Sequence, residues 1–334
     1  MKKISICIPT FNRHKSLRNC LNSIIENDGV DWEAVDICIS DNCSKDQTEA
    51  VVLEAKKKID IKYIKNETNL GRVQNYLNVV NMASGKFVWM IGDDDLILPH
   101  SLKSLIDLLD TYSHKVDFFY VNSYLLDSSF VFSSKQPFST NSLSDDMKKF
   151  SPKTNSELMN FMDLINPNIS FDFLGGMYLS VFKKKNWCNH TKVLNKEDLE
   201  NKLIFSTFGN TFPHVKIFAN AFAKSKAYFC STPLSVTLSG EREWQPMYPL
   251  IRSIRLIEAL EEFRKHGLKL KKYYLFRNYA LGYFAQDFVK MMLDRKNSGW
   301  KYFSFRSHVI YNLIYPNFYL SFFYFFLRRL KIMN

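Results

Sequence analysis

The sequence lacks the patterns that mark several common classes of protein. It has no CxxC pair, no zinc-finger spacing, no RNP-type pattern, no basic-region heptad and no internal repeat. Its composition, 46% hydrophobic and 23% charged, excludes a disordered chain, a collagen-like chain and a disulfide scaffold. We therefore expect a globular protein that does not bind nucleic acid. At about 100–200 residues per domain, 334 residues make one large domain or one domain with an appendage.

The N-terminus has too short an apolar run for a secretory signal peptide. The run Ile4–Ile8 ends at Pro9, whereas the apolar region of a signal peptide needs about 7–15 residues. The six cysteines are scattered, as expected for reduced thiols without a structural disulfide. Both features predict a cytoplasmic protein.

The positive charge is concentrated near the C-terminus. The formal net charge is +12, and residues 250–334 hold 16 Lys and Arg against five Asp and Glu, a net charge of +11. The preceding residues are therefore almost neutral. A basic segment of this kind favours anionic partners, such as an acidic membrane surface.

An aromatic tail ends this basic segment. The apolar stretch Phe318–Leu327 is followed by Arg328, Arg329 and Lys331, a combination typical of interfacial membrane anchors. We expect peripheral attachment to the inner face of the cytoplasmic membrane. Two alternatives remain: a spanning helix that extends back to His308, and a core or oligomer-interface helix.

The first 125 residues alternate between two hydrophobic periods. Short apolar runs predict strands near residues 4–8, 35–40, 61–64, 87–91 and 116–124. Helical spacing predicts helices over 14–27, 46–58 and 72–83, and a further helix that begins at Pro99. This alternation indicates βαβ units, and hence an α/β fold with a mostly parallel sheet.

The remaining sequence is less regular. Residues 125–155 are rich in serine and predict a long surface loop. Strands are expected over 173–182 and 227–238, with helical stretches near 196–205 and 212–223. From Tyr248 onward the pattern is helical, roughly over 249–265, over 271–293 and in the tail.

Polar residues follow each of the first four strands. They are the segments 9–13, 40–46, 69–72 and 92–95. The carboxyl ends of parallel strands meet at one edge of the sheet, which is where α/β proteins bind ligands. We therefore expect one site built from these four segments.

Three consecutive aspartates, Asp93, Asp94 and Asp95, follow the fourth strand. Like charges at the end of a buried strand repel one another unless a cation neutralises them. Mg²⁺ and Mn²⁺ prefer carboxylate oxygens and commonly complete their shell with substrate phosphates. The aspartates therefore predict a metal–diphosphate site, and the alternative is an acidic cap on the helix near Pro99.

Asp41 follows the second strand and has two possible roles. An aspartate at this position often only closes a turn, as Ser44 or Asp46 could only cap the next helix. A carboxylate at a strand end can also accept a hydrogen bond from a nucleotide base.

Taken together, these segments resemble glycosyltransferase family 2. That family has a PTYNR-like turn, a D(D/N)xSxD segment, an NxG turn and a DxD-type motif in this order. The corresponding residues here are Pro9–Arg13, Asp41–Asp46, Asn69–Gly71 and Asp93–Asp95. The resemblance covers about residues 3–245 and implies a GT-A fold, Rossmann-like, with a mostly parallel sheet flanked by helices. It also implies transfer of a sugar from a nucleotide-diphosphate donor to a saccharide acceptor.

The resemblance implies a division of the chain. Residues 1–247 would form the GT-A domain, with a nucleotide-binding half at about 1–125 and an acceptor half at about 156–247. Residues 248–334 would be a helical, basic and aromatic extension, a possible membrane-association region.

The resemblance also implies roles for single residues. Asp95 would hold Mn²⁺ or Mg²⁺ together with Asp93, with Asp94 as the competing ligand. Gly92 departs from the family pattern, which has an acidic residue there. The nucleotide sugar would contact residues from all four segments: Pro9, Thr10, Phe11, Arg13, Asp41, Asn69, Gly71, Arg72, Asp93 and Asp94.

On the acceptor side, the resemblance implies a glycine segment, Gly175 and Gly176. Glu243 and Trp244 are further candidates for this side of the pocket. The catalytic base is open between His214, Asp198 and Glu197. Thr211–Val215 resembles a segment of abequosyltransferase-like members, which favours His214. The alternatives are a buried core histidine and acids that only begin a helix.

The expected reaction is inverting, with a base that deprotonates the acceptor hydroxyl. A lipid-linked acceptor in bacterial surface-polysaccharide assembly would account for the basic tail. Two other classes remain open: a nucleotidyltransferase, and a catalytically silent membrane or assembly module of the same fold.

Overall fold

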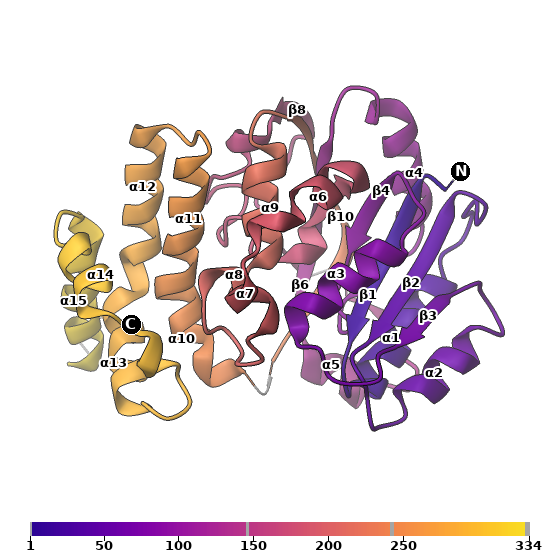
Figure 1. Cartoon of the computed structure of the whole chain (residues 1–334), viewed down its shortest axis with the longest axis horizontal. Helices are drawn as coiled ribbons and strands as arrows, with labels where there is room; N and C mark the ends of the chain where they lie inside the picture. Colours follow the sequence, from indigo (N-terminus) through magenta and orange to yellow (C-terminus); the bar gives the residue numbers. More distant parts are fainter. Residues whose placement is uncertain (1, 145–146, 241–243, 331–334) are drawn as a thin grey trace.

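The computed structural model describes residues 2–144, 147–240 and 244–330. A central sheet is flanked by helices on both faces, and further helices form a layer at one end of the molecule, away from β3 (Figure 1). The expected α/β fold is confirmed. All six cysteines, which lie within the described ranges, are free thiols.

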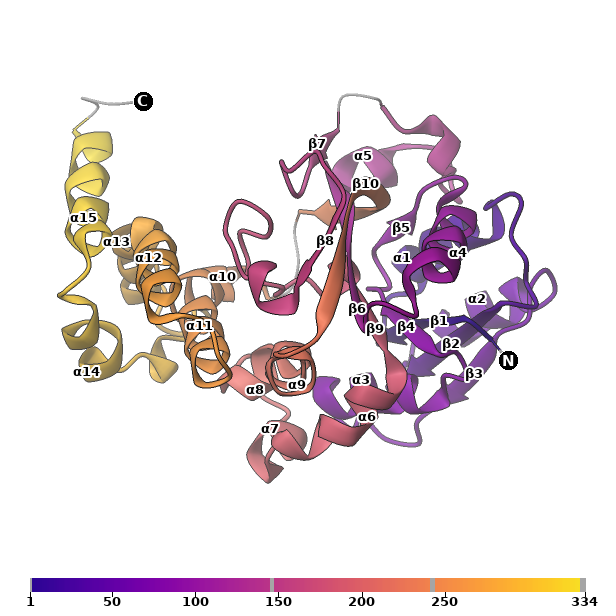
Figure 2. The same cartoon turned by 90° about the horizontal axis from the view of Figure 1, so that it is seen from above.

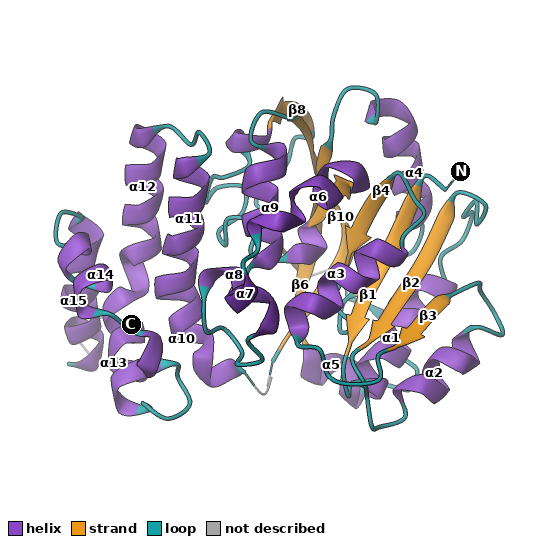
Figure 3. Ribbon diagram, viewed as in Figure 1, coloured by secondary structure: helices purple, strands orange, loops and turns teal. Residues whose placement is uncertain are grey.

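The sheet has the strand order β3-β2-β1-β4-β9-β6-β10-β5, with β7 and β8 paired to β6 and β10. Its N-terminal half is parallel, as the alternation predicts, because β1 pairs in parallel with both β2 and β4, and β2 with β3. β9 is antiparallel to both β4 and β6, so β6 runs in the direction of β4 (Figure 3). The bounds of these strands are Ile4–Thr10 (β1), Val35–Asp41 (β2), Lys62–Lys65 (β3), Phe87–Met90 (β4), Leu96–Ile97 (β5), Phe118–Asp127 (β6), Ser180–Lys183 (β9) and Lys226–Ser239 (β10).

Four helices connect the first strands: α1 (His14–Ile25), α2 (Thr48–Ala55), α3 (Arg72–Met82) and α4 (Ser101–Tyr112). Their apolar faces pack against a sheet whose central strands are buried throughout. The predicted start of α4 at Pro99 is wrong. His100 adopts a left-handed conformation with φ 60°, so the helix begins at Ser101.

The serine-rich segment is more ordered than the predicted surface loop. β6 continues to Asp127, and α5 (Ser128–Ser133), β7 (Lys148–Lys149) and β8 (Glu157–Asn160) follow. Val131, Phe138 and Phe150 are buried and attach the segment to the body of the protein. Single apolar residues at irregular spacing anchor it, which is why periodicity does not reveal it.

Two further predicted elements, a strand and a helix, are longer than the elements observed. The strand expected over 173–182 is reduced to β9, because Phe173 and Leu174 have positive φ angles of 51° and 67° and cannot continue a strand. The helix expected over 196–205 ends after α7 (Lys196–Glu200). It is followed by α8 (Phe208–Thr211) and α9 (Pro213–Phe222).

The C-terminal region is helical, as expected, with more breaks than predicted. α10 (Tyr248–Leu250) passes through a π-helical turn into α11 (Leu256–Lys265), and α12 (Leu270–Ala280) is separated from α13 (Phe284–Leu293) by a 3₁₀ turn. Arg252 and the buried Asp287 join two of these helices through bonds of 2.8 and 2.6 Å. α14 (Phe305–His308) and α15 (Pro316–Arg329) complete the layer (Figure 2).

The aromatic tail forms α15, which has two different faces. Phe318 and Ser321 are buried, and Phe318 packs against Phe284 of α13. Tyr319, Phe323 and Phe326 are between 54% and 59% exposed. No helix within the described ranges has both the length and the apolar character needed to cross a lipid bilayer.

Candidate active site

The predicted site residues gather at one edge of the sheet. β1 and β2 end together, with Thr10 opposite Asp41, and β4 ends beside them (Figure 3). β9 is antiparallel to β4, with Val181 opposite Trp89, so the chain before β9 also lies at this edge. The donor segments and the glycine segment Gly175–Gly176 therefore share one edge, as the sequence predicts.

Asp93 and Asp94 are held by residues that follow β1. Thr10 Oγ1 donates a hydrogen bond of 2.8 Å to Asp93 Oδ2. Arg13 Nη1 lies 2.9 Å from Asp94 Oδ2 and 3.5 Å from Asp93 Oδ1. Asp93 is buried, so the Arg13 guanidinium offsets part of the repulsion between the two carboxylates.

Gly92 explains how Asp94 and Asp95 fit so close together. Asp95 Oδ2 accepts a 2.7 Å hydrogen bond from the Gly92 amide. A Cβ at position 92 would lie 2.7 Å from Asp94 Oδ1 and 3.0 Å from Asp95 Oδ2. The two carboxylates thus meet over the glycine, which accounts for the absence of an acidic side chain at this position.

This arrangement fits a divalent cation that relies on its substrate for ligands. Among the described residues, no group of three or more His, Cys, Asp or Glu side chains forms a metal cage. Mg²⁺ typically binds one or two carboxylates and takes other ligands from phosphates and water. The metal pair predicted from the sequence, Asp95 with Asp93, stays a prediction; the structure adds that the carboxylates of Asp94 and Asp95 both lie next to Gly92.

Asp41 is engaged in the turn that follows β2. It is fully buried, and its oxygens accept hydrogen bonds of 2.8 Å from the Ser44 amide and from the Tyr63 hydroxyl. Burial and the Asp41 charge raise the pKa of Tyr63. These contacts correspond to the turn-closing alternative, and contact between Asp41 and a nucleotide base stays a prediction.

Asn69 and Gly71 belong to a hydrogen-bonded connection between two strand-end loops. Asn69 Oδ1 accepts from Asn42 Nδ2 at 2.8 Å and from the Gly71 amide at 2.9 Å. Gly71 has φ 87°, a left-handed conformation that glycine adopts without strain. Asn69 therefore shapes the site through its side chain, and Gly71 through its backbone.

The segment Pro9–Arg13 has one exposed aromatic ring at the edge of the site. Phe11 is 41% exposed directly after the buried Pro9 and Thr10. The next residue, Asn12, has φ 53°, and its side chain accepts a 2.8 Å hydrogen bond from the Lys45 amide. An exposed ring on a fixed turn is suited to stacking against a planar group.

Arg72 points to the other half of the molecule. Its guanidinium donates to the carbonyl oxygens of Asn210 and Thr211, and it lies 4.6 Å from the ring centre of Phe205. Trp244 packs edge-on against Phe205 at 5.5 Å. Arg72 therefore ties α3 to the segment before α9, and its contact with a nucleotide stays a prediction.

His214 lies under the glycine segment. Its Nε2–H donates to the carbonyl oxygens of Leu174 and Gly175, at 3.2 and 3.0 Å. Nδ1 is buried and has no hydrogen-bond partner among the described residues. Burial lowers the pKa of His214 to about 4, so the imidazole is neutral at physiological pH and supports the Gly175 backbone.

Asp198 belongs to the start of α7. It forms a capping box with Asn195, accepts a 2.8 Å hydrogen bond from Thr207, and lies 2.7 Å from Lys216 Nζ. Glu197 is exposed on the same short helix. These contacts match the helix-start alternative for both acids. Glu243 lies outside the described residues.

Asp172, which lies shortly before the glycine segment, was not predicted from the sequence. Asp172 accepts hydrogen bonds from Ser170 Oγ and from the Gly176 amide, at 2.5 and 2.6 Å. Burial raises the pKa of Asp172. An aspartate close before two glycines was the one available signal.

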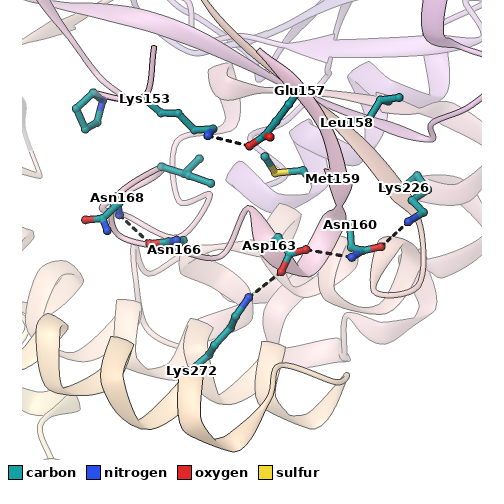
Figure 4. A pocket seen from close by; sticks show the side chains of 12 residues that line it. Lys153, Glu157, Leu158, Met159, Asn160, Asp163, Asn166, Asn168, Lys226 and Lys272 are labelled. Carbon is teal, nitrogen blue, oxygen red and sulfur yellow. Dashed lines mark hydrogen bonds and ion pairs between the residues drawn. The ribbon is translucent and has the colours of Figure 1, made fainter. Parts of the chain in front are cut away.

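A cavity of about 800 Å³ lies at the opposite edge of the sheet, where β10 begins. Figure 4 shows the side chains that line it. It borders β8, whose Asn160 pairs with Lys226 at the beginning of β10. Four of its charged lining residues form two ion pairs, Lys153 with Glu157 and Lys272 with Asp163, and Lys226 donates to Asn160. Because Asp93–Asp95 lie at the other edge, this cavity is separate from the candidate site.

Comparison with known proteins decides the family. The profile of Glycosyl transferase family 2 matches residues 5–181, just over half of the chain. The chain belongs to this family. The matched residues include Thr10, Asp41, Asp93–Asp95 and the glycine segment.

Two curated relatives in this family are bacterial. Abequosyltransferase RfbV of Salmonella typhimurium is 40% identical over 110 residues, which are 32% of this chain and 33% of that protein. The GalNAc(5)-diNAcBac-PP-undecaprenol beta-1,3-glucosyltransferase of Campylobacter jejuni is 38% identical over 117 residues, 34% of this chain and 37% of that protein. The matches thus span about a third of each relative.

Two solved structures share the fold over most of the chain. TarS 1–349 of Staphylococcus aureus in complex with UDP-GlcNAc has a TM-score of 0.52 and 16% identity, covering 85% of this chain and 81% of that one. The mannosyltransferase PcManGT of Pyrobaculum calidifontis, in complex with GDP-Man and Mn²⁺, has a TM-score of 0.52 and 12% identity, covering 88% and 75%. At these identities the likeness concerns the fold, and the expected GT-A fold is confirmed.

Proposed function

We propose that this protein is a glycosyltransferase that moves a sugar from a nucleotide-diphosphate donor to a saccharide acceptor. The observation that carries the proposal is the gathering of Asp93, Asp94 and Asp95 with Thr10 and Arg13 at the carboxyl edge of the sheet. Membership of glycosyl transferase family 2 supports it. The two solved structures in complex with UDP-GlcNAc and with GDP-Man also support it.

The residues at this edge have separable tasks. Asp94 and Asp95 would hold Mn²⁺ or Mg²⁺ over Gly92, and such an ion, when bound, offsets negative charge on a diphosphate. Thr10 and Arg13 keep Asp93 and Asp94 in place before the donor arrives. A group held in advance needs no reorganisation during the reaction.

Transfer with inversion requires an attack on the anomeric carbon from the face opposite the diphosphate. The glycine segment lies at the same edge as the aspartates and is continuous with β9. The chain packs closely here, since a Cβ on Gly175 would meet the Phe212 ring at 3.2 Å, so the glycines hold the segment in place at this edge. We assign this segment to the acceptor.

We further propose that the acceptor is lipid-linked and that the C-terminal helices attach the enzyme to the cytoplasmic face of the membrane. Residues 1–247 would then be the catalytic domain and 248–334 the attachment region. Most of the exposed large apolar side chains among the described residues lie in the helical C-terminal region. Arg328 and Arg329 are exposed at the end of α15. Apolar side chains beside cations suit an anionic lipid surface, where each cation contributes about 1 kcal/mol.

One experiment separates this function from the two alternatives. The full chain is incubated with a membrane lipid extract, Mn²⁺ and a panel of nucleotide sugars, and in parallel with nucleoside triphosphates and sugar phosphates. A glycosyltransferase releases nucleoside diphosphate from the first set, and a nucleotidyltransferase releases pyrophosphate from the second. If neither nucleoside diphosphate nor pyrophosphate is released, the result would favour a non-enzymatic module and contradict the proposal.

A further inference from the structure

Asp172 is a half-buried carboxylate at the acceptor end of the site, and its turn holds it rigidly. The Gly176 amide and Ser170 Oγ donate to its two oxygens. Phe173 and Leu174, both fully buried, have left-handed φ angles of 51° and 67°. Residues other than glycine rarely adopt this conformation, because it strains the backbone. The fold therefore maintains a strained turn that fixes one carboxylate.

Tyr178 connects this carboxylate to the donor half. Trp89 of β4 donates a 2.7 Å hydrogen bond to the Tyr178 carbonyl oxygen, so Tyr178 lies against the strand that leads into Asp93–Asp95. Besides burial, the negative charges of Asp172 and Asp95 both raise the pKa of Tyr178. A Cβ on Gly176, whose amide donates to Asp172, would lie 2.8 Å from the Tyr178 ring, so Tyr178 packs between the Asp172 turn and β4.

Two of the three catalytic residues predicted from the sequence, His214 and Asp198, are committed elsewhere, and the third, Glu197, is exposed on α7. His214 donates Nε2–H to two carbonyl oxygens, and its Nδ1 is buried. Asp198 is enclosed by Thr207, Lys216 and its own capping box. A base must come within hydrogen-bond reach of the proton that it removes, and neither side chain is free to approach a sugar hydroxyl.

We propose that Asp172 is the general base of the transfer reaction, an assignment that rests on the proposed function. The Asp172 carboxylate takes the proton of the acceptor hydroxyl as the acceptor oxygen forms its bond to the anomeric carbon. The bond between that carbon and the diphosphate oxygen breaks, and its electron pair leaves with the nucleoside diphosphate. Ser170 Oγ and the Gly176 amide hold the two carboxylate oxygens in a fixed orientation. Burial raises the pKa of Asp172 toward the working pH, which suits a base.

The test compares two aspartate-to-asparagine variants of the full chain. In Asp172→Asn the amide oxygen can accept from Gly176, and the amide nitrogen can donate to the Ser170 hydroxyl, so the turn is retained. In the matched control, Asp198→Asn, a buried ion pair with Lys216 is lost instead. The measurements are nucleoside diphosphate release with the lipid extract, the pH profile of kcat/KM, the Kd of nucleoside diphosphate with Mn²⁺, and the melting temperature.

Asp172→Asn is expected to lower kcat/KM by about 10²–10⁴-fold. It should also remove the acidic limb of the pH profile and leave nucleotide Kd and melting temperature within error of the wild type. Asp198→Asn should lower the melting temperature and keep the acidic limb. Asp172→Glu, which retains a carboxylate, should recover part of the activity.

Two outcomes contradict the assignment and are distinguishable. Wild-type turnover that Asp172→Asn leaves intact, or lowers only together with the melting temperature, overturns the role of Asp172 and spares the proposed function. A wild type that releases no nucleoside diphosphate from any donor overturns the proposed function and this role with it.

Discussion

Thr10 and Asp93 are 83 residues apart in the chain, and a 2.8 Å hydrogen bond joins Thr10 Oγ1 to Asp93 Oδ2. Both side chains are buried where the parallel strands β1 and β4 end. The bond connects the first motif of the family to the last one in the donor half. It fixes the orientation of Asp93 before any ligand arrives.

Replacing Thr10 by valine removes this donor at almost unchanged volume. The buried Asp93 oxygen then loses a partner, and we expect the free energy of unfolding to fall by about 1–3 kcal/mol. Urea unfolding measures the change. Thr10→Ser keeps the hydroxyl and serves as the control. Equal stability of the valine and serine variants would show that the bond does not matter.

The variant Gly92→Ala tests whether the carboxylates of Asp94 and Asp95, which lie next to Gly92, bind the metal ion. The added Cβ would lie 2.7 Å from Asp94 Oδ1 and 3.0 Å from Asp95 Oδ2, so at least one carboxylate must move. We expect Mn²⁺-dependent binding of nucleoside diphosphate to weaken at least tenfold, as measured by titration calorimetry. Gly282→Ala is the matched control, because its Cβ would meet nothing within 4 Å. Unchanged binding in Gly92→Ala would argue against Asp94 and Asp95 as the metal pair.

The buried His214 gives stability a defined pH dependence. Burial lowers its pKa from 6.5 to about 4 in the folded state, so between these values the unfolded chain binds the extra proton. The free energy of unfolding is therefore highest above pH 6.5. It falls by up to about 3 kcal/mol as the pH drops toward 4. Urea unfolding at several pH values should show this loss, and His214→Gln should reduce it. Identical pH dependence in both proteins would contradict the buried neutral imidazole.

The exposed face of α15 should control membrane binding. We expect replacement of Tyr319, Phe323 and Phe326 by serine to reduce co-flotation with liposomes that contain anionic lipid by at least fivefold. The control replaces Phe130 and Phe132 by serine, since these residues are exposed on α5, outside the C-terminal layer. Equal flotation of the two variants would contradict attachment through α15.

The donor half could be predicted from sequence because its signals are local. The central strands β1, β2 and β4 are short, buried runs, and the helices α1, α3 and α4 have apolar faces that pack against the sheet. Parallel strands bring their ends together, so the edge that holds Thr10, Asp41 and Asp93 follows from the strand assignments.

The acceptor half could not be predicted in the same way, because long-range contacts decide it. The left-handed Phe173 and Leu174 shorten a predicted strand, and no local pattern marks such a turn. Arg72 looks like a donor ligand in the sequence, yet its guanidinium binds carbonyl oxygens almost 140 residues away. Asp198 has the composition of a catalytic acid, and Lys216 and Thr207 enclose it in the fold.

The most direct test of the account is metal-dependent donor turnover. Wild type and Asp95→Ala are compared for nucleoside diphosphate release from the nucleotide-sugar panel with lipid extract, with Mn²⁺ and with chelator. We expect the wild type with Mn²⁺ to release nucleoside diphosphate from one donor. Chelation of the metal, or Asp95→Ala, should lower the rate of release at least 100-fold. Release that persists in Asp95→Ala at the wild-type rate would contradict the site at Asp93–Asp95.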